Sequence, residues 1–194
     1  MRWMNSRSSR RDRPRWRVDV LDSDPESRAE VSRLVESRGA TVVVDAAPRP
    51  DAVALLCHVK PDAVMLAAED ATEDGAVTDL FPSDLLAPVV LIADPAIARA
   101  LEPGRIGGVM GLLLRPVRPE ELRPTLEVAI ARFRELRRLR RILADRPVIE
   151  QAKAALMSRD GLSEPAAFSW LRRRAMDQRM QMGEVARAVL AGET

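Results

Sequence analysis

The side chains best suited to binding a charged partner lie near the C-terminal end of the chain. They are Gln151, Lys153, Arg159, Arg172, Arg173 and Arg174. Guanidinium groups present forked donors that fit phosphates and base edges. Three successive helical residues cannot all face one way, so we expect at least one of the three adjacent arginines to be solvated or paired with Glu164 or Asp177. These residue types favour anion binding.

Patterns that would indicate catalysis or metal binding are missing from the sequence. There is no glycine-rich phosphate loop, and the single cysteine, Cys57, and single histidine, His58, have no partners for a zinc site. We therefore expect no enzyme activity, no metal and no cofactor.

Five short apolar runs, which predict strands, alternate with helical patterns in the first two thirds of the chain. The runs cover residues 18–21, 41–44, 63–66, 89–92 and 109–114, and the helical patterns lie near 25–38, 50–59, 75–86, 95–105 and from 119 onward. This alternation predicts an α/β domain with a five-stranded parallel sheet covered on both faces. Ligands in such sheets bind at the carboxyl ends of the strands. Any binding or catalytic site of this domain is therefore expected near Asp22, Ala67 and Ala93, which lie at these ends.

A longer helix is predicted from residue 120 to 143, with apolar residues at alternating spacings of four and three. This spacing predicts a coiled-coil seam and a homodimer, although Arg140 interrupts it. The seam positions are Leu126, Ala129, Phe133, Leu136 and Leu143. Packing of this helix only on its own sheet is the alternative, and it would leave Phe133 and Leu136 exposed.

The last segment, residues 147–194, predicts three short helices. Pro147 suits the first turn of a helix, residues 160–161 end that helix, and Ser163 caps the second. The second helix is expected to end near Asp177, and the third to cover about 182–190. Their core is expected at Ala152, Leu156, Met157, Ala167, Phe168, Leu171 and Ala175. Trp170 fits either a stacking platform or a dimer contact.

The same segment resembles a known family. The stretch Val148-Ile-Glu-Gln-Ala-Lys-Ala-Ala-Leu-Met157, then Gly161-Leu-Ser-Glu, Ala167-Phe168, Leu171-Arg-Arg and Ala175-Met176 is similar to the ANTAR domain of transcription antitermination regulators. This resemblance implies an antiterminator that binds paired hairpins in nascent leader mRNA. The implied RNA contacts are Gln151, Lys153, Arg159, Arg172, Arg173 and Arg174. We expect Lys153 and the arginines to be solvated in the free protein.

Residues 16–120 resemble a receiver domain of flavodoxin-like fold, and 121–146 the helical coiled-coil linker, that precede ANTAR in the AmiR and NasT type of regulator. Receivers have paired acids after the first strand, whereas this chain has Asp22-Ser23-Asp24. Ala67 stands at the phosphoacceptor position, Ala93 at the hydroxyl position and Arg115 at the lysine position, while Asp74-Gly75 is retained. The resemblance therefore predicts a pseudo-receiver that is not switched by aspartyl phosphorylation, and magnesium binding is not expected without a third carboxylate.

The resemblance also implies a protein partner, because AmiR and NasT type regulators are held inactive by ligand-sensing proteins of the periplasmic-binding-protein fold. Two other functions remain open from the sequence. One is a DNA-binding response regulator with a C-terminal helix-turn-helix, although the third helix offers only Glu184 and Arg187 as contacts. The other is a signalling adaptor that binds only protein.

Charge is strongly segregated along the chain. Residues 1–17 carry +6, residues 18–130 carry −10 and residues 131–194 carry +6, which indicates an anionic partner at one or both ends. Residues 1–15 predict a disordered basic leader. No apolar run is long enough for a membrane span and no signal peptide is evident, so we expect a cytoplasmic protein without membrane contact.

Overall fold

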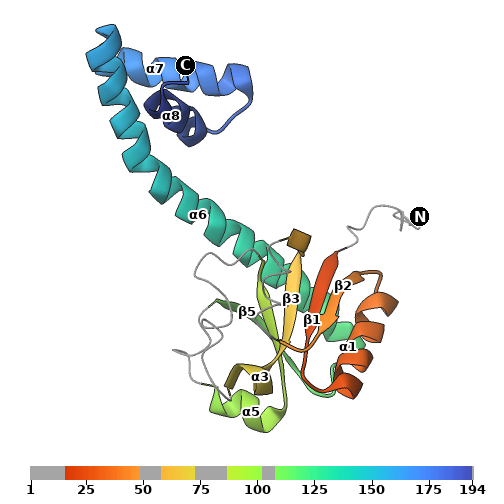
Figure 1. Cartoon of the computed structure of the whole chain (residues 1–194). Helices are drawn as coiled ribbons and strands as arrows, with labels where there is room; N and C mark the ends of the chain where they lie inside the picture. The colour runs from red at the N-terminus through yellow and green to blue at the C-terminus, as the bar shows by residue number, and fades with distance from the viewer. Residues whose placement is uncertain (1–15, 49–57, 73–86, 102–107, 194) are drawn as a thin grey trace, which may run out of the picture. The chain divides into compact units, whose positions relative to one another are not determined.

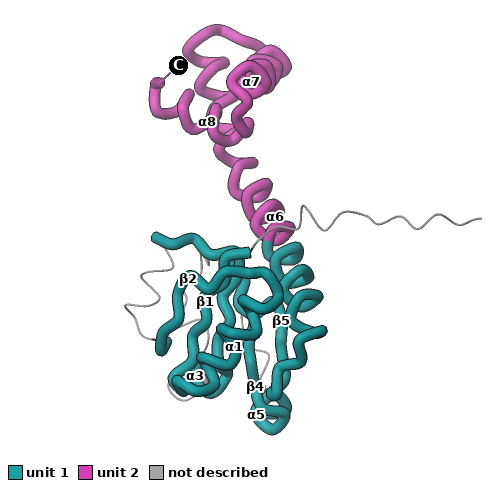
Figure 2. The backbone as a smooth tube through the Cα atoms, turned by 90° about the vertical axis from the view of Figure 1, so that its right-hand side faces the viewer, with its two compact units in different colours: residues 1–133 teal, residues 134–194 magenta. Residues whose placement is uncertain are grey.

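The computed structural model describes residues 16–48, 58–72, 87–101 and 108–193 (Figure 1). The chain divides into two compact units, an N-terminal unit of residues 1–133 and a C-terminal unit of residues 134–194 (Figure 2). The expected basic leader at 1–15, the helix expected at 75–86 and most of the one at 50–59 lie outside the described residues.

The N-terminal unit contains one parallel sheet, which confirms the predicted fold class. Its strands are β1 (Arg17–Leu21), β2 (Thr41–Ala46), β3 (Ala63–Ala67), β4 (Val89–Ala93) and β5 (Val109–Leu114). Their order is β2-β1-β3-β4-β5, and every neighbouring pair is parallel. Strands β3 and β4 are buried at every position, as expected where helices cover both faces of a parallel sheet.

Apolar cores lie on both faces of this sheet. On one face, α1 (Pro25–Ser37) and the start of α6 (Pro119–Asp160) pack over Val20, Met65 and Ile92. The other face has a second apolar core that includes Leu21, Leu66 and Leu91, and it is approached by α5 (Pro95–Ala100) and the short α3 (Ala68–Thr72). Figure 1 shows α1 and the start of α6 beside the sheet and α3 and α5 at the carboxyl ends of its strands. Two layers of apolar packing thus fix where the carboxyl ends of the strands lie.

One charged residue interrupts this buried sheet. Asp19 lies in the middle of β1 and is completely buried. Neither of its carboxyl oxygens has a hydrogen-bond partner among the described residues. Burial raises the pKa of Asp19 to about 6, and the backbone of Val44 and the charge of Arg17 offset this rise only in part. A buried carboxyl group without a partner favours its neutral form.

The predicted dimer seam needs correction at its N-terminal end. Leu126 and Ala129 belong to the core of the N-terminal unit, and Phe133 is buried as well. These residues pack within their own chain and cannot also line an intermolecular seam. Leu136 is half-buried and Leu143 is 71% exposed, so of the predicted seam positions these two remain open to a partner.

The C-terminal unit consists of residues 134–160 of α6, then α7 (Glu164–Gln178) and α8 (Met182–Ala191). The prediction that a new helix begins at Pro147 is wrong, because α6 continues through this residue to Asp160. Proline removes the hydrogen bond to the carbonyl of Leu143 and places its ring against that carbonyl. Both residues are exposed, so water can satisfy the freed carbonyl. The predicted end at Asp160 and the second helix after Ser163 are confirmed.

A small apolar core joins these three helices. It confirms Ala152, Leu156, Ala167, Leu171 and Ala175, and α8 adds Val185, Ala186 and Val189. Met157 and Phe168 are 40% and 41% exposed, so their assignment to the core is wrong. Each follows a core residue directly in the sequence, Leu156 or Ala167, and therefore lies on the side of its helix next to the core-facing side. Among the described residues, no helix combines the length and the apolar character needed to cross a membrane.

Candidate functional site

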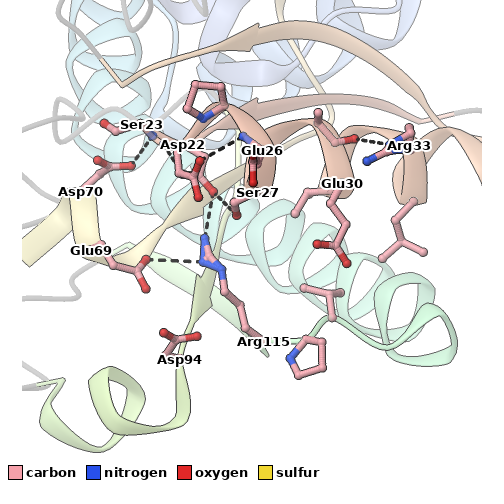
Figure 3. Close-up of a pocket in the computed structure, with 17 residues that line it drawn as sticks. Asp22, Ser23, Glu26, Ser27, Glu30, Arg33, Glu69, Asp70, Asp94 and Arg115 are labelled. Carbon is pink, nitrogen blue, oxygen red and sulfur yellow. Dashed lines mark hydrogen bonds and ion pairs between the residues drawn. The ribbon is translucent and has the colours of Figure 1, made fainter.

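A polar hollow lies at the carboxyl ends of β1, β3 and β5 (Figure 3). Asp22 follows β1 directly and is only 3% exposed. Its Oδ1 accepts the backbone N–H of Asp24 at 2.9 Å, and its Oδ2 accepts the hydroxyl of Ser27 at 2.6 Å. The Nη2 of Arg115, which follows β5, donates to the same Oδ2 at 2.8 Å. The carboxylate of Asp22 therefore has three hydrogen-bond partners among the residues that the structure describes.

The guanidinium group of Arg115 places a positive charge directly beside Asp22 in this hollow (Figure 3). Besides Asp22, it pairs with Glu69, whose Oε2 lies 3.6 Å from Nη1. The side chain of Arg115 is 21% exposed and that of Asp22 is 5% exposed, so water screens this pair only partly. An arginine of the protein thus neutralises the buried carboxylate.

The neighbouring acids are engaged in local structure. Asp24 caps α1, its Oδ1 accepting the backbone N–H of Glu26 at 3.0 Å. Asp70 accepts the backbone N–H of Ser23 at 2.9 Å, so Ser23 contributes its backbone to the hollow. Within the described ranges, no group of three or more acids, histidines or cysteines is arranged to hold a metal ion.

The positions expected for a phosphoacceptor and its hydroxyl switch are apolar and buried. Ala67 ends β3 and Ala93 ends β4, and they are 1% and 0% exposed. Because β3 lies next to β1 in register, Ala67 sits beside Asp22. A methyl group at this edge has no oxygen to accept a phosphoryl group. The retained Asp74-Gly75 pair lies outside the described residues.

A second candidate surface is the outer side of α7. Leu171 and Ala175 face the core of the C-terminal unit, while Arg172 and Arg173 are exposed. Among the described residues, neither arginine takes part in an ion pair or a hydrogen bond. The expected solvated arginine on this helix is therefore present.

Arg174 lies differently, with its guanidinium carbon 5.9 Å from the centre of the Trp170 ring. Trp170 itself packs partly against the core. This contact is a cation–π interaction, which holds the two side chains together on one flank of α7. The ring of Trp170 is therefore only partly available as a stacking platform.

Lys153 does not meet the expectation of a solvated RNA contact. Its side chain is only 10% exposed, and its Nζ donates to Glu150 at 2.8 Å and to Glu164 at 2.7 Å. These bonds raise the pKa of Lys153, and the bond from Lys153 lowers the pKa of Glu164. The lysine joins α6 to the first turn of α7, so we assign it to the fold.

The other two predicted contacts have different environments. Gln151 is exposed on α6. Arg159 is also exposed, but its Nε and Nη2 donate to the two carboxyl oxygens of Asp160 at 2.9 Å and 3.0 Å, which lowers the pKa of Asp160. Arg159 would have to exchange this carboxylate for a phosphate in order to bind RNA.

A contact between α6 and α8 was not found from the sequence. Asp145 is buried, and its Oδ1 accepts from Arg187. Gly183 of α8 lies against this carboxyl group, so that a Cβ on Gly183 would overlap the Asp145 carboxyl group. No local pattern links these positions, although a glycine in the first turn of a helix could have indicated a close approach.

Known proteins resemble this chain both in its C-terminal unit alone and over most of its length. The ANTAR domain family matches residues 137–190. The transcriptional regulatory protein PdtaR of Mycobacterium tuberculosis is 31% identical over 182 residues, covering 90% of this chain and 89% of that protein. The nitrate regulatory protein of Klebsiella oxytoca is 43% identical over 56 residues, which are 29% of this chain and 14% of that protein.

Among solved structures, a response regulator receiver domain protein from Clostridium thermocellum shares the fold of the N-terminal unit. Its TM-score is 0.51 at 16% identity, and the match covers 62% of this chain and 98% of that chain. At this identity the likeness concerns the fold alone.

Proposed function

The chain belongs to the ANTAR-domain transcriptional regulators, and we propose that it is an RNA-binding antiterminator without catalytic activity. In the proposed mechanism it binds paired hairpins of a nascent leader mRNA and thereby keeps an overlapping terminator from forming. The observation that carries the proposal is the run of exposed arginines on α7, which lies inside the ANTAR domain.

Side chains on one stripe of α7 suit the recognition of RNA loops. Phe168, Arg172 and Met176 follow one another at intervals of four residues, and all three are exposed, so they are neighbours on the helix surface. Sequence-specific RNA recognition uses unpaired bases that stack on aromatic rings or guanidinium planes. We propose that Arg172 and Arg173 contact the loop, with Gln151 and Arg159 at its margin.

The receiver-like unit is proposed to respond to protein contact instead of phosphorylation. Two features support this proposal: the buried Ala67 beside Asp22, and the Arg115 guanidinium that already neutralises Asp22. By analogy with the AmiR and NasT type, the contact would come from a ligand-sensing protein of the periplasmic-binding-protein fold.

A homodimer is proposed to form through the part of α6 beyond Phe133. Leu136 is half-buried there, and Leu139 and Leu143 are exposed at 48% and 71%. Their spacing of three and four residues gives one apolar stripe. Two C-terminal units held together in this way would match the two hairpins of a paired target.

Equilibrium binding tests the proposed function. A pool of RNAs with two hairpins and randomised loops is selected on the full chain, and an enriched RNA is titrated against a duplex DNA of equal length over a salt series. We expect preference for the RNA, weakened by Arg172→Ala and Arg173→Ala, with roughly 1–3 kcal/mol lost for a base-edge contact. Leu171→Ala is the control, since a core truncation should cost about 2–5 kcal/mol of stability and lose binding only through unfolding.

The same titration separates the other functions. Tighter binding to duplex DNA would indicate a DNA-binding response regulator. Weak binding to both nucleic acids at every salt concentration would leave a protein-binding adaptor. A template in which the selected hairpins overlap a terminator then measures readthrough by RNA polymerase, which should rise with the wild-type chain and not with Arg172→Ala.

A further inference from the structure

The excess positive charge of the C-terminal end lies outside the three-helix core that carries the proposed loop contacts. Residues 132–146 of α6 hold seven arginines and two acidic residues, a net charge of +5. Residues 147–194 hold seven basic and six acidic residues, a net charge of +1. Long-range attraction of a polyanion is therefore expected from α6 before Pro147, where no binding residue has been assigned.

The arginines and leucines of this segment occupy opposite faces of α6. Each residue of an α-helix turns by about 100°, so residues spaced by three, four or seven share a face. Arg134, Arg138 and Arg141 make one stripe, and all three are exposed. Leu136, Leu139 and Leu143 make the other. A dimer formed through the leucines would leave the arginine stripe open to solvent.

By helical periodicity, the arginine stripe continues into the face of α6 that packs on the rest of the C-terminal unit. One turn after Arg141 on this face comes Asp145, which binds Arg187 of α8, and two turns later comes Ala152 of the core. The stripe therefore lies on the same side of α6 as α7 and α8. An RNA bound at α7 and extending along α6 would pass over it.

These arginines have few partners within the protein. Within the part of the chain that the structure describes, no ion pair or hydrogen bond includes Arg134 or Arg141. Arg138 pairs with Glu135 at 3.3 Å, and both side chains are more than half exposed, so water and salt weaken the pair. Like charges on successive helical turns repel. An external anion would relieve this repulsion.

We propose that the face formed by Arg134, Arg138 and Arg141 is a second RNA contact, which binds the phosphate backbone of the hairpin stem. This inference rests on the proposed RNA-binding function and assigns it a second surface. The stripe is about 10 Å long, and a double helix such as DNA presents a phosphate charge about every 1.7 Å of its axis. Phosphate contacts set position and base contacts set specificity, so α6 supplies affinity and α7 supplies loop preference.

The test compares two triple variants of the full chain. R134Q/R138Q/R141Q removes the stripe, and R33Q/R38Q/R118Q removes the same charge from exposed arginines of the N-terminal unit. Affinity for the selected two-hairpin RNA and for a loop-scrambled copy is measured over a salt series. The stripe variant should lower the slope of log affinity against log salt by about two to three units for both RNAs. Its preference between the two loops and its thermal melting should match wild type, and the control should keep the wild-type slope.

Other outcomes overturn the inference in distinguishable ways. An unchanged slope in the stripe variant, with wild type still selecting its loop, refutes the second contact and leaves the proposed function intact. Loss of loop preference shows that the stripe contacts bases, whereas failure of wild type to bind any RNA removes the proposed function itself. If phosphatidylglycerol vesicles bind wild type but not the stripe variant, and the RNA slopes agree, the stripe serves a membrane surface. If the triple variant melts early, R134Q and R141Q are tested singly, each with an expected slope change of about one unit.

Discussion

In the N-terminal unit the buried carboxylate of Asp22 is bound by Arg115 of the same chain, whereas in the C-terminal unit Arg172 and Arg173 of α7 face solvent without an ion pair among the described residues. The first arrangement leaves little for an external ion to bind. The second leaves charges that a polyanion can neutralise. A charged residue therefore indicates a binding surface only after its internal partners are known. Each unit also contains one residue that departs from this pattern. In the N-terminal unit Asp19 is buried without a hydrogen-bond partner among the described residues, and in the C-terminal unit Lys153 is paired with Glu150 and Glu164.

The largest effect is expected from Asp19, whose carboxyl group is buried and has no hydrogen-bond partner within the described ranges. Each pKa unit corresponds to about 1.4 kcal/mol, so raising the pKa of Asp19 from 3.8 to about 6 makes its ionisation in the folded state cost roughly 3 kcal/mol. The folded state binds this proton more tightly than the unfolded state. Its stabilising effect is complete below pH 3.8 and is lost as the pH rises through about 6.

The variant Asp19→Asn should lack this loss. The difference in unfolding free energy between variant and wild type, measured by urea denaturation at a series of pH values, should shift in favour of the variant as the pH rises. Asp94→Asn is the control, because Asp94 is exposed at the start of α5 and its side chain makes no capping bond. Parallel curves for wild type and Asp19→Asn would show that Asp19 titrates normally.

A slightly smaller effect is expected when the internal neutralisation of Asp22 is removed. Arg115→Ala would leave the buried Asp22 carboxylate with Ser27 and the backbone N–H of Asp24 as its remaining partners in the described part of the chain, which should cost about 2–3 kcal/mol of stability. Adding Asp22→Asn should recover part of this loss, because it removes the stranded charge. Arg33→Ala, an exposed arginine on α1, should change stability by less than about 0.5 kcal/mol. Equal losses for Arg33→Ala and Arg115→Ala would mean that the Arg115 pair contributes nothing specific.

Lys153 and Arg172 test the comparison within the C-terminal unit. Lys153→Met should lower the melting temperature, because Glu150 and Glu164 then lose their common partner, and RNA affinity should fall only where the unit unfolds. Arg172→Ala should lower RNA affinity without lowering the melting temperature. Circular dichroism and RNA titration on both variants give the result. If Lys153→Met keeps its melting temperature and loses affinity, Lys153 is an RNA contact after all.

The last prediction is that phosphorylating reagents have no effect on the protein. Because Ala67 offers no oxygen and Arg115 occupies the Asp22 carboxylate, acetyl phosphate and beryllofluoride should leave the mass, the oligomeric state and the RNA affinity unchanged. Intact-mass spectrometry and light scattering measure this directly. A stable acyl phosphate mapped to the N-terminal unit would contradict the proposed independence from phosphorylation.

Local signals account for what could be predicted from the sequence. The apolar runs of β3 and β4 predicted strands because both faces of the sheet are buried, and Gly161 and Ser163 gave the boundary between α6 and α7. The prediction for Pro147 failed because the preference of proline for the first helical turn does not exclude it from a helix interior, here at an exposed position of α6. The Arg115 to Asp22 bond joins positions 93 residues apart, and the Lys153 to Glu164 bond depends on the packing of α7. Neither bond is indicated by a local pattern in the sequence.

The contact between Asp145 and Gly183 constrains how sequences of this family can change over evolutionary time. A methyl group on Gly183 would overlap the Asp145 carboxyl group, which itself binds Arg187. We therefore expect a substitution at any one of these three positions to be accompanied by changes at the others. Relatives that carry a larger residue at position 183 should carry a smaller one at 145, and the acid should be kept only where glycine is kept. Covariation of these two columns would trace the α6 to α8 contact through the family without any further structure.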